Sequence, residues 1–182
     1  MPFCVIKSKT IKFVFVMCLV AVLLAVSING NNSAQVFFGY AERKVPIYAV
    51  NTTEKKVAIS FDAAWGAEKT EKIIEICNDF NVKATFFLVG FWVDKYPELV
   101  KKIDENGFEI GTHSKTHPDM SKLSKEAIIE ELASSKKMIE DITGKTVELF
   151  RPPYGAYNNT LIEVCEQQKL IPIQWSVDSL DW

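Results

Sequence analysis

The two histidines of the chain, His113 and His117, are separated by only three residues. Imidazole is a common protein ligand for divalent transition metals. Two histidines at positions i and i+4 can reach one ion from a helical turn or a tight loop. A chance pair on a polar surface loop would have the same spacing. The pair alone therefore indicates a metal site and a surface loop about equally, and the rest of the chain has to decide.

The other side chains that could do chemistry share one position, because each follows a short apolar run. Such runs, rich in β-branched and aromatic residues, are typical of buried strands. These side chains are Asp62 after run 57–61, His113 and His117 after 108–110, Arg151 after 147–150, and Asp178 and Asp181 after 170–176; a further run covers 84–89. Polar residues at the end of one strand after another argue against a purely structural role at all of these positions.

The segments between these runs have the apolar spacing of helices. Helices are predicted at about 68–80, from 97 to about 106, from the N-cap Ser124 to Gly144, and around 161–165. Strands that alternate with helices over short connections predict an α/β fold with parallel strands. In α/β barrels the carboxyl ends of the strands meet at one face, which carries the active site. The polar clusters are therefore expected to converge on one site.

The N-terminus has the pattern of an export signal. Lys7, Lys9 and Lys12 precede an apolar run, 13–28, that contains no charge. The run is long for a signal peptide and slightly short for a membrane span, and no clear small-x-small cleavage site follows it. We expect residues 1–34 to be an uncleaved signal-anchor, with a cleaved signal peptide as the alternative. The lysines would keep the N-terminus in the cytoplasm and place the domain outside, membrane-anchored or secreted.

Residues 35–56 are expected to be a linker and a lead-in segment, and residues 57–182 the folded domain. Pro46 lies in the apolar run 45–50 and cannot donate to a strand ladder, so this run is at best an edge strand. The chain has 21 basic and 23 acidic residues and no basic stripe. This charge balance argues against a nucleic-acid partner.

In order and spacing, these clusters resemble the motifs of polysaccharide deacetylases of the NodB-homology class, carbohydrate esterase family 4. The matching segments are Ser60-Phe61-Asp62-Ala63-Ala64-Trp65-Gly66, His113-Ser114-Lys115-Thr116-His117, Arg151-Pro152-Pro153-Tyr154-Gly155 and Asp178-Ser179-Leu180-Asp181-Trp182. Each motif alone is weak, but four in order are specific. The variant of the first motif and the N-terminal segment are most similar to PdaB-type deacetylases of spore-forming bacteria. The resemblance implies a distorted (β/α) barrel and, for this type, a place in the spore envelope.

The resemblance also implies a reaction: metal-dependent hydrolysis of N-acetyl groups on amino sugars of a cell-wall or spore polysaccharide, peptidoglycan-like or chitin-like. A divalent metal, zinc in the first place, would polarise the amide and acidify a bound water. The implied roles are metal binding for His113 and His117, general base for Asp62, pairing with that base for Arg151, an oxyanion contact for the Tyr154 N–H, orientation of an acid histidine for Asp181, and substrate contacts for Tyr154 and Trp182.

Two departures from the family pattern keep a second interpretation open. The position of a metal-binding aspartate is Ala63, so the third protein ligand is unassigned, and no Leu-x-His motif precedes Trp182. From the second departure we expect a barrel that is incomplete at its C-terminus. The alternative is a catalytically impaired carbohydrate-binding or structural envelope protein on the same scaffold. The histidine pair with Asp62 and Arg151 favours the enzyme.

Overall fold

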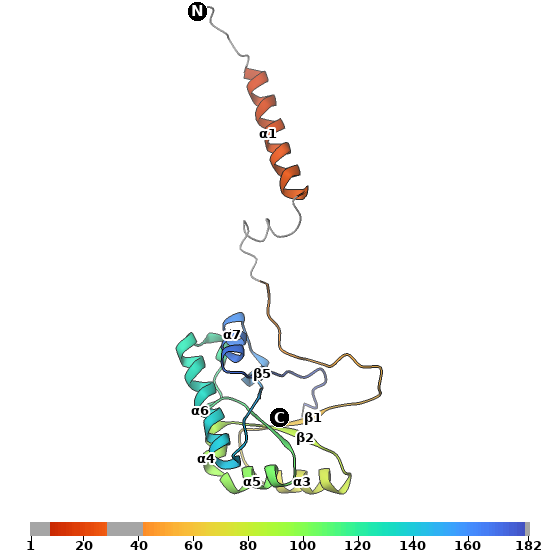
Figure 1. Ribbon diagram of the computed structural model, residues 1–182, viewed down its shortest axis with the longest axis vertical. Coiled ribbons are helices and arrows are strands. Elements are labelled where there is room, and N and C mark those ends of the chain that lie inside the picture. The colour runs from red at the N-terminus through yellow and green to blue at the C-terminus, as the bar shows by residue number, and fades with distance from the viewer. Residues whose placement is uncertain (1–7, 29–41, 181–182) are drawn as a thin grey trace, which may run out of the picture. The chain divides into compact units, whose positions relative to one another are not determined.

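The computed structural model describes residues 8–28 and 42–180. The chain divides into two compact units, Met1–Arg43 and Lys44–Trp182. The first unit contains helix α1, Ser8–Ile28 (Figure 1). In the described ranges, no helix has both the length and the hydropathy that crossing a bilayer requires.

The second unit alternates strands and helices, as predicted. Its elements are β1 (Ile59–Ala63), α3 (Thr70–Asp79), β2 (Ala84–Leu88), α4 (Gly90–Lys95), α5 (Pro97–Glu105), β3 (Glu109–Thr112), η1 (Met120–Lys122), α6 (Lys125–Thr143), β4 (Leu149–Phe150), η2 (Pro153–Gly155), α7 (Asn159–Gln167) and β5 (Ile171–Pro172). Strand β1 begins two residues later than the apolar pattern suggests, and the short helix α4 was not predicted.

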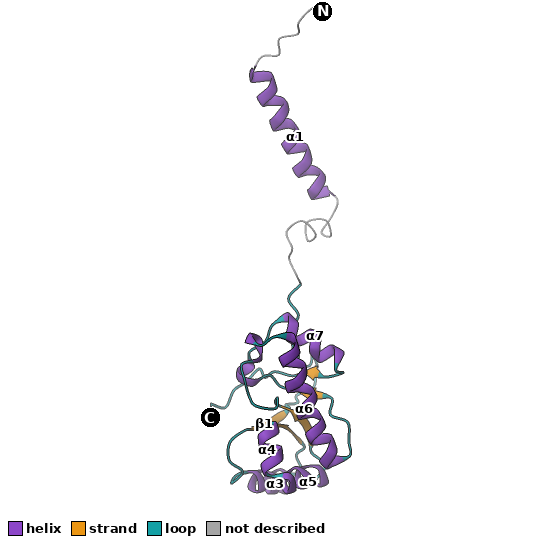
Figure 2. Ribbon diagram, turned by 90° about the vertical axis from the view of Figure 1, so that its left-hand side faces the viewer, coloured by secondary structure: helices purple, strands orange, loops and turns teal. Residues whose placement is uncertain are grey.

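The five strands form one parallel sheet in the order β1-β2-β3-β4-β5. Crossovers between parallel neighbours are right-handed almost without exception, so a sheet built in sequence order carries its helices on one face. The helices accordingly gather around one side of the strands (Figures 1 and 2). The register pairs Asp62 with Phe87, Leu88 with Thr112, and Thr112 with Phe150. This register brings the carboxyl ends of the first four strands to one edge.

The lead-in segment extends the sheet at its β5 edge. The backbone N–H of Ile47 donates to the carbonyl of Pro172 at 2.9 Å, and the N–H of Gln174 donates to the carbonyl of Ile47 at 2.8 Å. This run, predicted to be at best an edge strand, forms a single parallel bridge between Ile47 and Ile173 rather than a strand. Within the described residues β1 is the opposite edge, so the sheet is an open arc, as predicted for an incomplete barrel.

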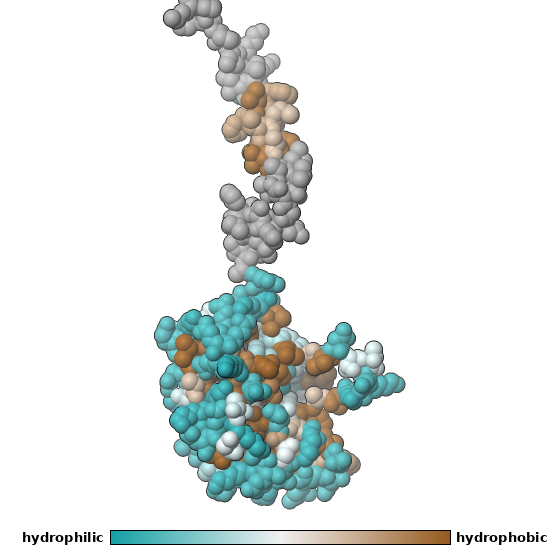
Figure 3. All heavy atoms as spheres, in the orientation of Figure 1, coloured by the Kyte–Doolittle hydropathy of each residue, from teal (hydrophilic) through white to brown (hydrophobic). Residues whose placement is uncertain are grey.

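Helix α6 is the main covering element, and its ends follow the predicted signals. The Ser124 hydroxyl accepts from the N–H of Ala127, and Gly144 ends the helix with a φ of 68°. Ile128, Leu132 and Ile139 on one face are completely buried. The surface of the domain in Figure 3 is largely hydrophilic, with hydrophobic residues exposed in its middle.

Candidate functional site

Three of the predicted site residues meet at the carboxyl edge of the sheet. Asp62 lies near the end of β1, while His113 and Arg151 directly follow β3 and β4. Ladder bonds continue past the strand ends, because the N–H of His113 donates to Leu88 and that of Arg151 donates to Thr112, both at 2.9 Å. The backbone of the sheet itself therefore sets the spacing of these side chains.

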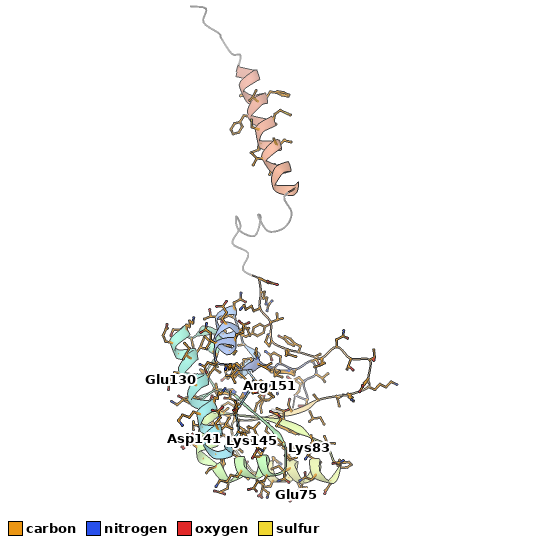
Figure 4. All side chains as sticks on the ribbon, viewed as in Figure 1. Glu75, Lys83, Glu130, Asp141, Lys145 and Arg151 are labelled. Atoms are coloured by element: carbon orange, nitrogen blue, oxygen red, sulfur yellow. The ribbon has the colours of Figure 1, made fainter. Side chains whose placement is uncertain are left out.

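Arg151 is the buried centre of this site, with only 5% of its surface exposed. Its Nη1 donates to Oδ1 of Asp62 and its Nη2 to Oγ of Ser60, both at 2.8 Å. Ser60 and Asp62 are two positions apart on β1, so both point to the same face of the sheet. The guanidinium also lies 4.1 Å from the centre of the Phe87 ring. Figure 4 shows Arg151 within the domain, whereas Glu130 and Asp141 lie at its margin.

Replacing Arg151 with methionine is expected to lower the free energy of unfolding by about 2–3 kcal/mol. Breaking a fully buried ion pair costs roughly 3–5 kcal/mol, and the Asp62 side chain keeps 34% exposure, which reduces that cost. Urea unfolding followed by circular dichroism measures the loss. The matched control is Lys145→Met, which breaks the pair with Asp104 on the surface, where the Lys145 side chain is 66% exposed, and is expected to cost about 1 kcal/mol or less. Equal losses in the two variants would contradict the central role of Arg151.

His113 is held in one orientation. Its Nδ1 lies 2.7 Å from the carbonyl oxygen of Arg151, and because that oxygen can only accept, Nδ1 carries the proton. Nε2 then faces Oδ2 of Asp62 at 3.7 Å. Burial lowers the pKa of His113, and this outweighs the opposing effect of the Asp62 carboxylate. A neutral Nε2 with a free lone pair therefore faces a carboxylate oxygen across a gap that a proton or cation would bridge.

His117 lies beside His113, with 4.9 Å between the ring centres. Its Nδ1 is buried and has no hydrogen-bond partner in the described part of the chain. Burial also lowers the pKa of His117. Its φ of 60° is left-handed, as are those of Ser114 (70°) and Tyr154 (59°). Non-glycine residues in this region are uncommon and often mark functional sites, and here three of them surround the histidine pair.

The loop between the histidines is fixed from two helices. From α6, the Glu131 carboxylate accepts from the N–H groups of Lys115 and Thr116 at 2.9 and 2.8 Å and from the Thr116 hydroxyl at 2.6 Å. From α4, the Gly90 N–H donates to the carbonyl of Ser114 at 2.9 Å. A Cβ on Gly90 would lie 2.9 Å from Lys115 Cα, so only glycine allows this approach. Both helices therefore position His117.

Replacing Glu131 with alanine is expected to lower the free energy of unfolding by roughly 1.5–3 kcal/mol, since a charged acceptor serving three donors is lost. It should also shift the NMR signals of the His117 ring. The matched control is Glu130→Ala on the same helix, because Glu130 accepts only from side chains, those of Lys115 and Ser134. The control should cost less than about 1 kcal/mol and leave the His117 signals in place. Unmoved His117 signals in Glu131→Ala would show that this carboxylate does not position the loop.

The donors present fit a divalent ion in part. His113 Nε2 has a lone pair that carries no proton, and His117 Nδ1 is a buried nitrogen with no hydrogen-bond partner among the described residues. Ala63 supplies no ligand, whereas catalytic zinc sites use three protein ligands. Within residues 8–28 and 42–180, no three His, Cys, Asp or Glu side chains are grouped closely enough to hold a metal. The structure thus brings together two of the expected ligands and leaves the third open.

The remaining predicted residues divide between the site and its surroundings. Tyr154, which is 68% exposed, contacts the His117 ring with 4.8 Å between centres. Asp181 and Trp182 lie outside the described residues. Ser60 and Glu131 contribute to the site although their positions in the sequence predicted no role for them. The strand period places Ser60 on the face of Asp62 and could have identified it, whereas nothing in the sequence links Glu131 to a loop some fifteen residues earlier.

Comparisons with known proteins identify the family of the domain. The sequence model described as polysaccharide deacetylase matches residues 49–172. The uncharacterized protein YlxY of Bacillus subtilis is 41% identical over 137 residues, which are 75% of this chain and 43% of YlxY. A peptidoglycan-N-acetylglucosamine deacetylase of Bacillus cereus is 31% identical over 145 residues, 80% of this chain and 53% of the relative. The chain therefore spans about half the length of these curated relatives.

A solved structure adds a different kind of relative. BA3943 of Bacillus anthracis, described as a CE4 family pseudoenzyme, matches with a TM-score of 0.74 and 37% identity over 76% of this chain and 49% of that one. A BA3943 mutant described as having restored enzymatic activity matches with the same TM-score and 38% identity, over 76% of this chain and 51% of the mutant. The same fold thus occurs in proteins with and without activity.

Proposed function

Because the chain belongs to the polysaccharide deacetylase family, we propose that it removes N-acetyl groups from amino sugars of a cell-wall polysaccharide of the peptidoglycan type. One observation carries the proposal: the ion pair between the buried Arg151 and the partly exposed Asp62 holds a carboxylate 3.7 Å from a neutral histidine nitrogen. An acid–base group beside a site able to hold a cation is what amide hydrolysis at neutral pH requires. The deacetylase named among the relatives supports the substrate class.

In this proposal each described side chain has a task. Asp62 accepts the proton of the attacking water, with its second oxygen fixed by Arg151. His113 is held by its Nδ1–H bond to the Arg151 carbonyl, so Nε2 points to the reacting group. Tyr154 presents its ring beside His117, and its backbone N–H is assigned to the developing oxyanion.

We assign a divalent ion, zinc in the first place, to His113 and His117. When bound, the ion would polarise the acetyl carbonyl and lower the pKa of its water. Two neutral imidazoles without a carboxylate should hold it more weakly than a three-ligand site. Assigning the ion to two histidines alone therefore predicts that zinc occupies the site only at elevated zinc concentration.

A second function is favoured by one specific observation. Ala63 removes a ligand position, and a pseudoenzyme is similar to this chain over 76% of its length. The alternative is a protein that binds the same glycan without cleaving it. Both functions require a glycan site at the carboxyl edge of the sheet, and they differ only in the release of acetate.

The test measures acetate and binding in parallel. The purified chain, with zinc, is incubated with N-acetylated peptidoglycan, and a chelator-treated sample is the control. Acetate release that the chelator abolishes supports the deacetylase. Retention of the chain on peptidoglycan without acetate release would select the binding function. Neither binding nor acetate release would reject both.

The proposed substrate lies outside the cytoplasm, and the N-terminal residues are proposed to take the domain there. Lys7, Lys9 and Lys12 ahead of an apolar segment are typical of an export signal. In protoplasts of a spore-forming bacterium expressing the chain, added protease is expected to digest residues 44–182. Immunoblotting measures the digestion, with a cytoplasmic protein as the control for lysis. Full protection of the domain would contradict the proposed orientation.

A further inference from the structure

Beside the histidine pair lies an exposed aromatic surface whose residues have no role in the site described so far. Trp65 is 74% exposed, and its ring centre lies 4.8 Å from that of His117. Phe91, at the start of α4, lies 6.3 Å from Trp65 and is also exposed. A single exposed aromatic ring is ordinary, but neighbouring exposed rings beside a group of polar side chains are typical of a place where a ligand binds.

The loop that carries Trp65 is anchored to the buried side chain of Trp92. The buried indole of Trp92 donates from Nε1 to the carbonyl oxygen of Gly66 at 2.6 Å. Ala64, on the other side of Trp65, is buried in the core. Gly66 has a φ of 74°, a conformation that side chains disfavour. Trp65 is therefore presented on an anchored turn, and binding to it costs little ordering entropy.

Phe91 is tied to the same site through the backbone. Its N–H donates to the carbonyl oxygen of Lys115 at 3.2 Å, directly within the loop between the histidines. The Trp65 ring thus contacts His117 from the turn that follows β1, and the Phe91 ring lies beside Trp65 at the start of α4. Through Trp65, this pair of rings borders the place where the acetyl group would react.

We propose that Trp65 and Phe91 form the apolar surface on which a pyranose ring of the N-acetylated glycan stacks. This inference rests on the proposed function. It adds a contact with the sugar ring that the roles proposed for Tyr154 and the other motif residues do not include. The C–H face of a pyranose is apolar, while its edges carry hydroxyl and acetamido groups, so a flat aromatic surface beside a polar site matches it. Rigid aromatic anchors of this kind commonly carry a large share of the binding energy.

The experiment measures binding of an N-acetylglucosamine tetramer to the full 182-residue chain by isothermal titration calorimetry. Trp65→Ala is expected to weaken binding about tenfold or more, and Phe91→Ala to weaken it less. Trp65→Phe should retain most of the affinity, because an aromatic face remains. The matched control is Phe80→Ala: Phe80 is 77% exposed but follows α3, at the amino end of the strands, and should not affect binding.

The outcomes separate this inference from the function beneath it. Thermal unfolding of each variant shows whether the fold is kept, and an exposed Trp65 predicts an unchanged midpoint. If the wild type binds the tetramer and Trp65→Ala binds it equally well, the aromatic surface is wrong and the proposed function stands. If Trp65→Ala slows acetate release without weakening binding, Trp65 acts through His117 instead, and the stacking proposal is overturned. If the wild type binds no tetramer, the proposed function fails and the inference fails with it.

Discussion

Replacing Asp62 with asparagine is expected to slow acetate release from an N-acetylglucosamine oligomer by roughly 10²–10⁴-fold, the usual contribution of a positioned general base. The amide keeps an oxygen that can accept from Arg151 Nη1, so the buried guanidinium remains partnered and the fold is retained. What is lost is the ability to take a proton from water. The rate should fall while binding of the oligomer changes little.

The same variant tests whether Asp62 has taken over the vacant ligand position. Zinc content after dialysis, measured by elemental analysis, should match the wild type if Asp62 is only the base. A joint loss of zinc and rate would show that Asp62 is a ligand. The matched control is Asp79→Asn. Asp79 is the last residue of α3, away from the carboxyl edge of the sheet, and this change should leave zinc content and rate unchanged. An unaltered rate in Asp62→Asn would remove Asp62 from the mechanism.

Replacing Ala63 with aspartate is expected to tighten zinc binding roughly tenfold or more, which corresponds to at least about 1.4 kcal/mol. The change adds a negatively charged third ligand to two neutral imidazoles, and three protein ligands are the usual catalytic set. Zinc titration by calorimetry measures it. His117→Ala in the same background should abolish the gain, because it removes one of the two existing ligands.

The geometry of β1 makes this a demanding test. Neighbouring residues of a strand point to opposite faces, and Ala63 packs against the hydrophobic core. The new carboxylate therefore has to turn around the strand end to reach the histidines. If it stays in the core, the free energy of unfolding falls and zinc affinity does not change. That result would contradict the assignment of position 63 as the third ligand position.

The positions of the main site residues at the ends of the strands were predictable from the sequence. The strand period and the alternation with helices predict a parallel sheet, and a parallel sheet aligns Asp62, His113 and Arg151 at its carboxyl edge. The capping residues Ser124 and Gly144 fix the ends of α6 for local reasons, so these ends were predicted as observed.

What the sequence could not predict depends on contacts between distant segments. Glu131 accepts from the histidine loop because α6 crosses over it, and no local pattern encodes that crossing. The tautomer of His113 follows from the Arg151 carbonyl, a backbone group from another strand. In the sequence, Trp65 is one residue of a motif, and nothing shows whether its ring is buried or exposed. The structure shows that Trp92 anchors the turn at Gly66 and that this turn holds Trp65 at the surface.

The most direct test of the central claim is a mass spectrum of an N-acetylglucosamine tetramer after incubation with the purified chain and zinc. The carboxyl-edge site formed by Asp62, His113 and Arg151 predicts products that have lost one or more acetyl groups. The Asp62→Asn variant, incubated in parallel, should leave the tetramer essentially intact. An unchanged tetramer in both samples, at a zinc concentration that saturates the wild type, would contradict the claim that this site hydrolyses N-acetyl groups.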